Sequence, residues 1–484
     1  MTNRSRQISA LAAVGGFFLL VIIGFWLRDV DLLGPAPEKS ILLEKVHMIG
    51  WSKENKAWEM KADSGWITAQ QETIILNQVG DGTLYQFGQL SGKKLAAREI
   101  QIHQRVHQIE TRGQKDSAGK VQIPVTGIVD LHAPSTSEEA KSRTSAPQWA
   151  KLSAGYIRYN TDNKLGNILD SVTLTTRGNT IRAPSATFDY QNRNIEFQDD
   201  PTISGPRFRF KMPKLTYNFR DGRAGAMGDI AGTIYPKKKS KRSGPMSVKG
   251  SVLRYDEQLK QATLSGNVSG RQKDKTVQAG ALIYDETVDK IFLINNAHVT
   301  LTKEGKPTDI QAAGGTLDPG TERATLEGNV LINQPGKQIS AMRTEFTSSS
   351  HQLGVSGHVY VLLESGHTLL KKESIAKLRN LEAKQAAAEQ TTLTCDRLNA
   401  STQSGDLDVI GNVAVHQTGK TAKASRGTYD DAAETITLTE NVYLSKNGDW
   451  LKTGRIKVSI RNETFEATEG VETEFKMNKK EKSE

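Results

Sequence analysis

Hydrophobic and polar residues alternate along most of the chain, in short runs that end at Gly, Asn or Asp. In the stretch "TLEGNVLI", Leu326, Val330 and Ile332 are apolar. Glu327 and Asn329, which lie between them, are polar. A period of two places these two kinds of residue on opposite faces of a β-strand. The pattern therefore predicts strands with one dry face, and the Gly two residues before the valine predicts a bulge or bend.

The phrase "GNV" and close variants of it recur at nearly constant spacing. Successive valines of the phrase are 31, 31, 29, 54, 29 and 29 residues apart. A second phrase, a small residue followed five positions later by an aromatic one, alternates with the first, as at Ala279/Tyr284 and Ala424/Tyr429. A unit of strand, turn and strand cannot bury its apolar face alone, whereas stacked units can. The chain is therefore predicted to be all-β, an elongated stack of two-strand repeats of about 30 residues. The copies of the first phrase are centred on Val268, Val299, Val330, Val359, Val413, Val442 and Val471, with fainter ones at Val172 and Ile203.

The one long interval, 54 residues, contains a stretch of different composition. The stretch "KKESIAKLRNLEAKQAAAEQ" is rich in Ala, Glu, Lys and Leu, which favour helices. Ile375, Leu378 and Leu381 follow one another at helical spacing. The sequence therefore predicts a short helical insertion over residues 371–390, and its removal restores the regular repeat.

The N-terminus carries a long apolar run. The segment from Gln7 to Leu27 contains no charged residue and would span about 30 Å as a helix. Arg4 and Arg6 precede it, so the positive-inside rule places the N-terminus in the cytoplasm. The prediction is a single-pass inner-membrane protein with a cytoplasmic tip over 1–7, a transmembrane helix over 8–27 and the bulk of the chain in the periplasm. A cleaved signal peptide is the alternative.

Composition and charge narrow the class of partner. A net charge of +10 favours anionic partners, such as nucleic acid, a membrane surface or phosphorylated lipid. Nucleic acid is disfavoured because no aromatic residues are interleaved with the basic run and because the predicted compartment is wrong. The single Cys395 permits no internal disulfide.

A cluster of basic residues lies in the stretch "YPKKKSKRSGP". It is either a patch for phosphorylated lipid head groups or a solvated linker over 236–245 between the two halves of the chain. The C-terminal residues 476–484 are predicted to be a disordered tail. The possible head-group contacts are Lys237, Lys238, Lys239, Lys241 and Arg242.

The search for catalytic chemistry gives no candidate. The sequence contains none of the common nucleophile, metal or phosphate-loop motifs. His103 and His107 lie in an alternating segment where a helix is not expected, so they are interpreted as surface histidines. A carbohydrate-active β-helix enzyme would need carboxylates clustered on successive rungs, whereas the polar positions are mostly Asn, Thr, Gly and Ser. No enzyme activity, metal or cofactor is predicted, and a structural scaffold or adhesin remains an alternative.

An N-terminal helix followed by repeats with "LxGNV" and "AxxxxYD" resembles the lipopolysaccharide-export bridge proteins. Residues 40–235 resemble the LptC-type anchor weakly, and residues 246–475 resemble the LptA/OstA-type subunit more specifically. The resemblance implies an open β-jellyroll with a V-shaped apolar groove. Such a groove would carry the acyl chains of lipopolysaccharide from an inner-membrane ABC transporter toward the outer membrane. A terminal edge strand would join a periplasmic bridge subunit or an outer-membrane translocon.

The apolar positions of the repeats are the predicted lining of that groove. An ordinary closed core is the alternative for the same positions, and alternation alone does not choose between the two. The predicted groove residues are Leu264, Val268, Leu326, Val330, Ile332, Val359, Val361, Val413, Val415, Val442 and Leu444.

Overall fold

A computed structural model describes the chain in two compact units. The first unit runs up to Ile234 and includes Lys249–Leu264, and the second consists of Tyr235–Val248 and the chain from Ser265 on. Both are built from antiparallel strands, as the alternating pattern predicted. The described residues are 39–52, 55–68, 72–134, 137–142, 146–160, 163–237, 244–273, 275–303, 306–347, 350–365, 376, 378–401 and 403–475.

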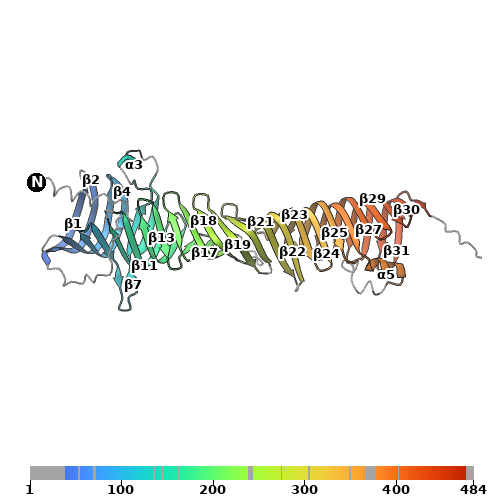
Figure 1. Ribbon diagram of the computed structural model, residues 1–484, viewed down its shortest axis with the longest axis horizontal. Coiled ribbons are helices and arrows are strands. Elements are labelled where there is room, and N and C mark those ends of the chain that lie inside the picture. The colour runs from blue at the N-terminus through green and yellow to red at the C-terminus, as the bar shows by residue number, and fades with distance from the viewer. Residues whose placement is uncertain are drawn as a thin grey trace, which may run out of the picture. The chain divides into compact units, whose positions relative to one another are not determined.

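The first unit starts with long strands. Farther along, two short strands can lie end to end beside one longer strand. Strands β1 to β4 pair in chain order. Farther along, β12 pairs with both β13 and β14, which occupy successive halves of its length. Figure 1 shows these strands in blue to green, with the short helix α3 (Ser137–Ser142) beside them. The strands are β1 (Lys39–Ser52), β2 (Asn55–Thr68), β3 (Thr73–Gln86), β4 (Gln89–His103), β5 (Gln108–Arg112), β6 (Gln114–Lys115), β7 (Val121–Ile123), β8 (Val125–Asp130), β9 (Trp149–Ala154), β10 (Tyr156–Asn160), β11 (Leu165–Thr175), β12 (Thr180–Asp189), β13 (Asn194–Gln198), β14 (Thr202–Ser204), β15 (Phe208–Lys211), β16 (Leu215–Asn218) and β17 (Arg223–Ile234).

The second unit is a more regular up-and-down arrangement. From β20 to β30 each strand pairs with the next one in the chain. The short strands β31 and β32 then both pair with β30. Residues of β18 (Met246–Asp256) and β19 (Gln261–Gln272) are divided between the two units. The other strands are β20 (Lys275–Asp285), β21 (Lys290–Lys303), β22 (Lys306–Asp318), β23 (Arg323–Gln334), β24 (Lys337–Thr347), β25 (Gln352–Leu363), β26 (Thr391–Ser401), β27 (Leu407–Gln417), β28 (Lys420–Asp430), β29 (Thr435–Lys446), β30 (Asp449–Ser459), β31 (Thr464–Thr468) and β32 (Glu472–Glu474).

The "GNV" phrase forms a bulge, as predicted. In β23 the register with β24 shifts between Glu327 and Val330. Gly328 and Asn329 both have positive φ, at 80° and 49°. A Cβ atom on Gly328 would lie 2.8 Å from the Cβ atom of Ala313, so a larger residue is excluded by space as well as by conformation. The phrase recurs because each repeat needs two consecutive left-handed residues at the same point of the strand.

Two copies of the phrase are displaced from their predicted positions. The residue after the left-handed pair is valine at Val330 and at six of the other predicted centres. After Asn295 and Asn296, however, it is Ala297, and after Asp199 and Asp200 it is Pro201. The predicted centres Val299 and Ile203 therefore lie two residues too far along. A displacement of two preserves the face of the strand, and both side chains are buried.

The predicted helical insertion is present in part. The helix α5 (Leu381–Ala388) lies between β25 and β26, and residues 366–375 and 377 lie outside the described residues. Over the ranges that the structure describes, no helix is long and apolar enough to span a membrane. The predicted transmembrane helix over 8–27 lies outside those ranges, as do the tip at 1–7 and the tail at 476–484.

Candidate functional site

The interior of the first unit is filled by aromatic side chains. The rings of Phe188 and Phe219 are 5.4 Å apart and nearly parallel. The rings of Phe208 and Tyr255 are 5.0 Å apart. Such pairs leave little free volume in a core. The largest fully buried side chains of this unit are Met60, Tyr159, Phe188, Phe197, Phe208, Phe210 and Tyr217.

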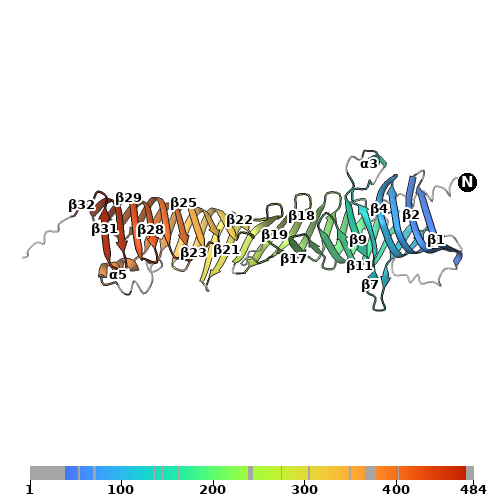
Figure 2. The ribbon, with the colours of Figure 1, turned by 180° about the vertical axis from the view of Figure 1, so that it is seen from behind.

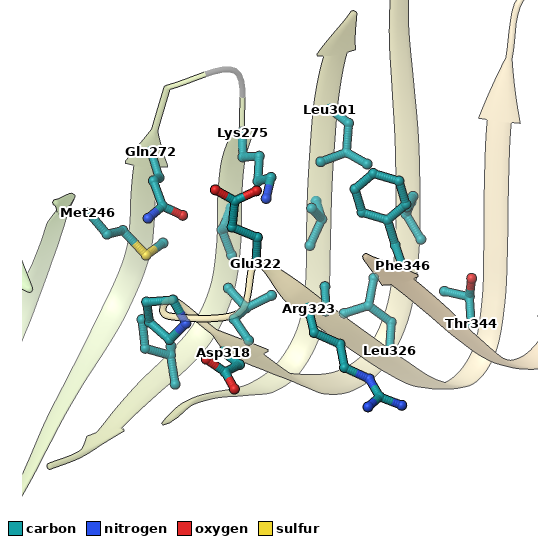
Figure 3. A pocket seen from close by; sticks show the side chains of 17 residues that line it. Met246, Gln272, Lys275, Leu301, Asp318, Glu322, Arg323, Leu326, Thr344 and Phe346 are labelled. Carbon is teal, nitrogen blue, oxygen red and sulfur yellow. The ribbon is translucent and has the colours of Figure 1, made fainter. Parts of the chain in front are cut away.

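The second unit begins with an equally tight interior. Figure 3 shows the narrow pocket at this point, where the side chains of Leu301, Leu326 and Phe346 lie close together. The free volume is about 30 Å³, which is close to the space of a single water molecule. The predicted groove residue Leu326 therefore lies in a packed core, which is the closed alternative.

Farther along the second unit the interior opens into a large cavity. Its volume is about 1020 Å³, and strands β24 to β31 supply most of its wall. The size is at the upper end of the range for ligand sites, about 300–1,000 Å³. The apolar lining consists of Ile339, Leu353, Val361, Leu363, Leu378, Ala386, Ala387, Leu393, Leu398, Ala400, Leu407, Val415, Ile436, Val458, Ile460 and Phe465.

The strands fold over to enclose this cavity. Leu407 and Gln417 are the two ends of β27, and both line the cavity. A straight strand of this length would hold its ends roughly 33 Å apart. The left-handed pair Gly411 and Asn412 lies in the middle of β27, at a shift of register with β28. The bulge therefore bends the strand, so that residues from both of its ends reach the same cavity. The two rows of strand ends are the two rims of the opening.

The segment around α5 covers this opening. Leu378 and Ala387 are each 7% exposed and face the cavity. The backbone N–H groups of Arg379 and Asn380 donate to the carboxylate of Glu463, in the turn before β31. An anion accepting these N–H groups caps the N-terminal end of α5 from another part of the chain. Figures 1 and 2, which view the molecule from opposite sides, both draw α5 beside β31.

The other end of the covering segment is held at the opposite rim. The amide nitrogen Nε2 of Gln417 donates to the carbonyl oxygen of Ala386 over 2.9 Å. The ammonium of Lys420 lies 3.3 Å from the carboxylate of Glu389. Gln417 and Lys420 flank the turn between β27 and β28, whereas Glu463 lies in the turn between β30 and β31. The segment thus spans the opening from one rim to the other.

The structure brings only some of the predicted groove residues to this cavity. Val361 and Val415 line it. Val415 and Leu444 also line an adjoining shallow pocket of about 310 Å³. The remaining predicted residues are buried but line neither pocket, and Leu326 lies in the narrow interior. These remaining residues are Leu264, Val268, Val330, Ile332, Val359, Val413 and Val442.

The other predicted positions lie apart from the cavity. Lys237 is exposed, and its backbone N–H donates to Asp289 over 2.9 Å. The rest of the basic cluster, Lys238, Lys239, Lys241 and Arg242, lies outside the described residues. His103, predicted to be a surface histidine, is half-buried, and its Nδ1 lies 3.2 Å from the hydroxyl of Thr73.

Sequence reasoning missed most of the cavity wall. Ile339, Leu393 and Ala400 lie on the strands that alternate with the "GNV" strands, and no lining role was predicted for those strands. The alternation of apolar and polar residues along these strands could have predicted that their apolar side chains face the interior. The contribution of Leu378 was hidden because a helical insertion can dock anywhere on the surface. Its position depends on Glu463, which is more than eighty residues away in the chain.

Stacked antiparallel strands that fold over at a bulge and enclose an apolar space define a β-jellyroll. Residues 247–352 and 309–464 each match the family described as LptA/(LptD N-terminal domain) LPS transport protein. The second match starts two repeat lengths after the first, as expected for a periodic sequence. These matches support the lipopolysaccharide-transport family for this part of the chain. This family is a non-enzymatic transport component, so the chain is not an enzyme.

Comparison with solved structures and curated proteins adds little detail. The chain is similar to LptH, described as the LptA homologous periplasmic component of the lipopolysaccharide transport device from Pseudomonas aeruginosa. The identity is 10% and the TM-score 0.18, over 36% of this chain and 96% of LptH. Among curated proteins no match was found.

The predicted localisation is wrong. A single-pass inner-membrane protein with a cytoplasmic N-terminus was expected from the charge-free run at 7–27. The matched family points instead to a periplasmic or outer-membrane protein. Hydropathy misled because a charge-free N-terminal run does not by itself distinguish an anchor from other targeting segments. The resemblance of residues 40–235 to the LptC-type anchor is not confirmed by these comparisons.

Proposed function

We propose that this protein carries lipopolysaccharide between the membranes of the cell envelope, and that the cavity under α5 holds the acyl chains. The observation that supports this most strongly is an apolar cavity of about 1020 Å³ within the part of the chain that matches the transport family. Each CH₂ group moved from water into such a space gains about 0.8 kcal/mol. A structural scaffold has no need of a cavity this large, because empty volume weakens packing.

The end of the second unit offers an edge for a neighbouring component. Among the described strands, β31 and β32 pair with β30 alone. Phe465, Val471 and Phe475 are 52%, 50% and 68% exposed in this last segment. An unpaired edge with apolar side chains suits the addition of a partner strand. The proposed partner is a periplasmic bridge subunit or an outer-membrane translocon, and an inner-membrane ABC transporter supplies the lipid upstream.

Site-specific photo-crosslinking in cells tests the proposal. A crosslinking residue at Val361 should capture lipopolysaccharide, because this side chain faces the cavity. The matched control is Tyr360, the next residue of the same strand, which is 40% exposed on the other face. A third position, Val330, lies in the predicted groove but away from the cavity and is 1% exposed. Mass spectrometry would identify the adducts.

The three positions separate four outcomes. Capture at Val361 alone supports a local cavity, and capture at both Val361 and Val330 supports a continuous groove that opens as lipid passes. Equal capture at Val361 and Tyr360 would mean nonspecific contact with membrane lipid. No capture at any position would favour a scaffold or adhesin over a carrier.

A further inference from the structure

Among the described residues that line the cavity, one has a basic side chain. Lys337 is the first residue of β24, at the rim of the opening, and it lines the cavity. Its cross-strand neighbours Gln334 and Leu363 line the cavity as well. The ammonium therefore lies where the apolar wall meets the mouth, and the side chain is half-buried.

Lys337 has no ion-pair partner among the residues that the structure describes. Burial lowers the pKa of Lys337, because the charged ammonium loses water without gaining a counter-ion. A cation in this condition is costly unless something pairs with it. An anion bound at the mouth would offset that cost.

The acidic residues of the wall are at the opposite rim and already have donors. The carboxylate of Asp406 accepts from the hydroxyl of Ser404 at 2.6 Å and from the backbone N–H of Asp431 at 3.0 Å. The carboxylate of Glu463 accepts from the backbone N–H groups of Arg379 and Asn380, at the N-terminal end of α5. Lys337 begins its strand, whereas these acids lie in the turns at the other ends of the strands. Among the described residues that line the cavity, the cation is therefore at one rim and the carboxylates are at the other. Glu364 and Glu389 also lie at the Lys337 rim, but neither lines the cavity: Glu364 is exposed, and Glu389 is paired with Lys420.

We infer that Lys337 binds the phosphate group of an amphiphile whose hydrocarbon chains occupy the cavity. This inference rests on the proposed function and adds the chemistry and orientation of the ligand to it. The phosphate lies at the Lys337 rim because the carboxylates of the other rim repel it. The chains point into the space lined by Val361, Leu393 and Val415.

Binding of two matched ligands to the purified full chain tests the inference. Tetradecyl phosphate and tetradecanol share one hydrocarbon chain and differ in the head group. Displacement of the neutral apolar dye N-phenyl-1-naphthylamine reports occupancy of the cavity. The variant Lys337→Met removes the charge and keeps most of the apolar stem, and Lys337→Arg keeps the charge. The control variant Lys423→Met removes an exposed lysine from β28 of the same unit.

The expected result is specific to the phosphate and to one lysine. Lys337→Met should lower the affinity for tetradecyl phosphate about tenfold, which is the size expected for the loss of one charge-assisted contact. The affinity for tetradecanol should change less than twofold, and Lys337→Arg should bind both ligands nearly as the parent chain does. Lys423→Met should have no effect. Inorganic phosphate alone should not displace the dye, because most of the binding energy comes from the hydrocarbon chain.

Other results would overturn the inference in distinguishable ways. If tetradecyl phosphate binds Lys337→Met as tightly as the parent chain, Lys337 does not contact the phosphate, although the cavity still carries hydrocarbon. If inorganic phosphate alone displaces the dye, the protein has an anion site that does not need a hydrocarbon chain, and the inferred amphiphile site is wrong. If neither tetradecyl compound displaces the dye from the parent chain, the proposed carrier function fails together with this inference.

Discussion

The first unit and the far part of the second unit are built from the same repeat, yet one is filled and the other is hollow. In the first unit, Phe188 stands five residues after Ala183 and is fully buried. At the equivalent places of the second unit, Ala400 stands five residues after Cys395, and Val458 stands five residues after Thr453. Both Ala400 and Val458 line the cavity. The smaller residues at these two positions thus accompany the change from a filled core to a cavity, while the backbone pattern stays the same.

Truncating a wall residue in each region should produce the largest contrast. Phe197→Ala should lower the free energy of unfolding by about 3–5 kcal/mol, because this fully buried side chain would leave a void in a packed core. Leu393→Ala should cost about 1–2 kcal/mol, since one side of Leu393 already borders empty space. Equilibrium urea unfolding measures both. Equal costs at the two positions would show that the far interior is as tightly packed as the first unit.

Adding volume should give the same contrast, with the larger cost again in the first unit. Ala186 is 1% exposed in the first unit, and Ala186→Phe should destabilise the fold by about 1–3 kcal/mol through overpacking. Ala400→Phe inserts the same ring into the cavity and should leave the free energy of unfolding within about 0.5 kcal/mol of the parent chain. It should also reduce binding of N-phenyl-1-naphthylamine. Strong destabilisation by Ala400→Phe would argue against a pre-formed cavity.

The sequence predicts the strands and their bulges well, and it predicts the cavity poorly. Alternation and the "GNV" phrase predict strands and bulges because both depend on neighbouring residues, and the structure confirms them at Gly328 and Asn329. The cavity depends on volumes summed over several strands. Its local signs are the alternation on the wall strands and the missing aromatic at Ala400 and Val458, and neither gives the volume of the cavity. Lys337 is indistinguishable from a surface lysine in the sequence, because its burial is a property of the folded rim.

The cover of the opening should depend on Glu463. Glu463→Ala removes the acceptor for the N–H groups of Arg379 and Asn380 and should destabilise the docked segment by about 1 kcal/mol. Hydrogen exchange at those two amides should become roughly fivefold faster, and the dye should dissociate faster. Glu466→Ala, which removes an exposed glutamate from β31, is the matched control and should change neither rate. An unchanged exchange rate in Glu463→Ala would mean that packing of Leu378 and Ala387 alone holds the segment.

The thiol of Cys395 should report that loosening the cover leaves the folded strands intact. Cys395 is 4% exposed and pairs across the strands with Val359. Burial, with the nearby Asp396 charge, raises the pKa of its thiol to about 11. At pH 8 only about one molecule in a thousand would then carry the reactive thiolate. Reaction with 5,5′-dithiobis(2-nitrobenzoate) should therefore be slow, accelerate about tenfold per pH unit below pH 11, and change less than twofold in Glu463→Ala. A large acceleration in that variant would show that the cover and strand β26 open as one unit, and the distinction between a movable cover and a fixed wall would fail.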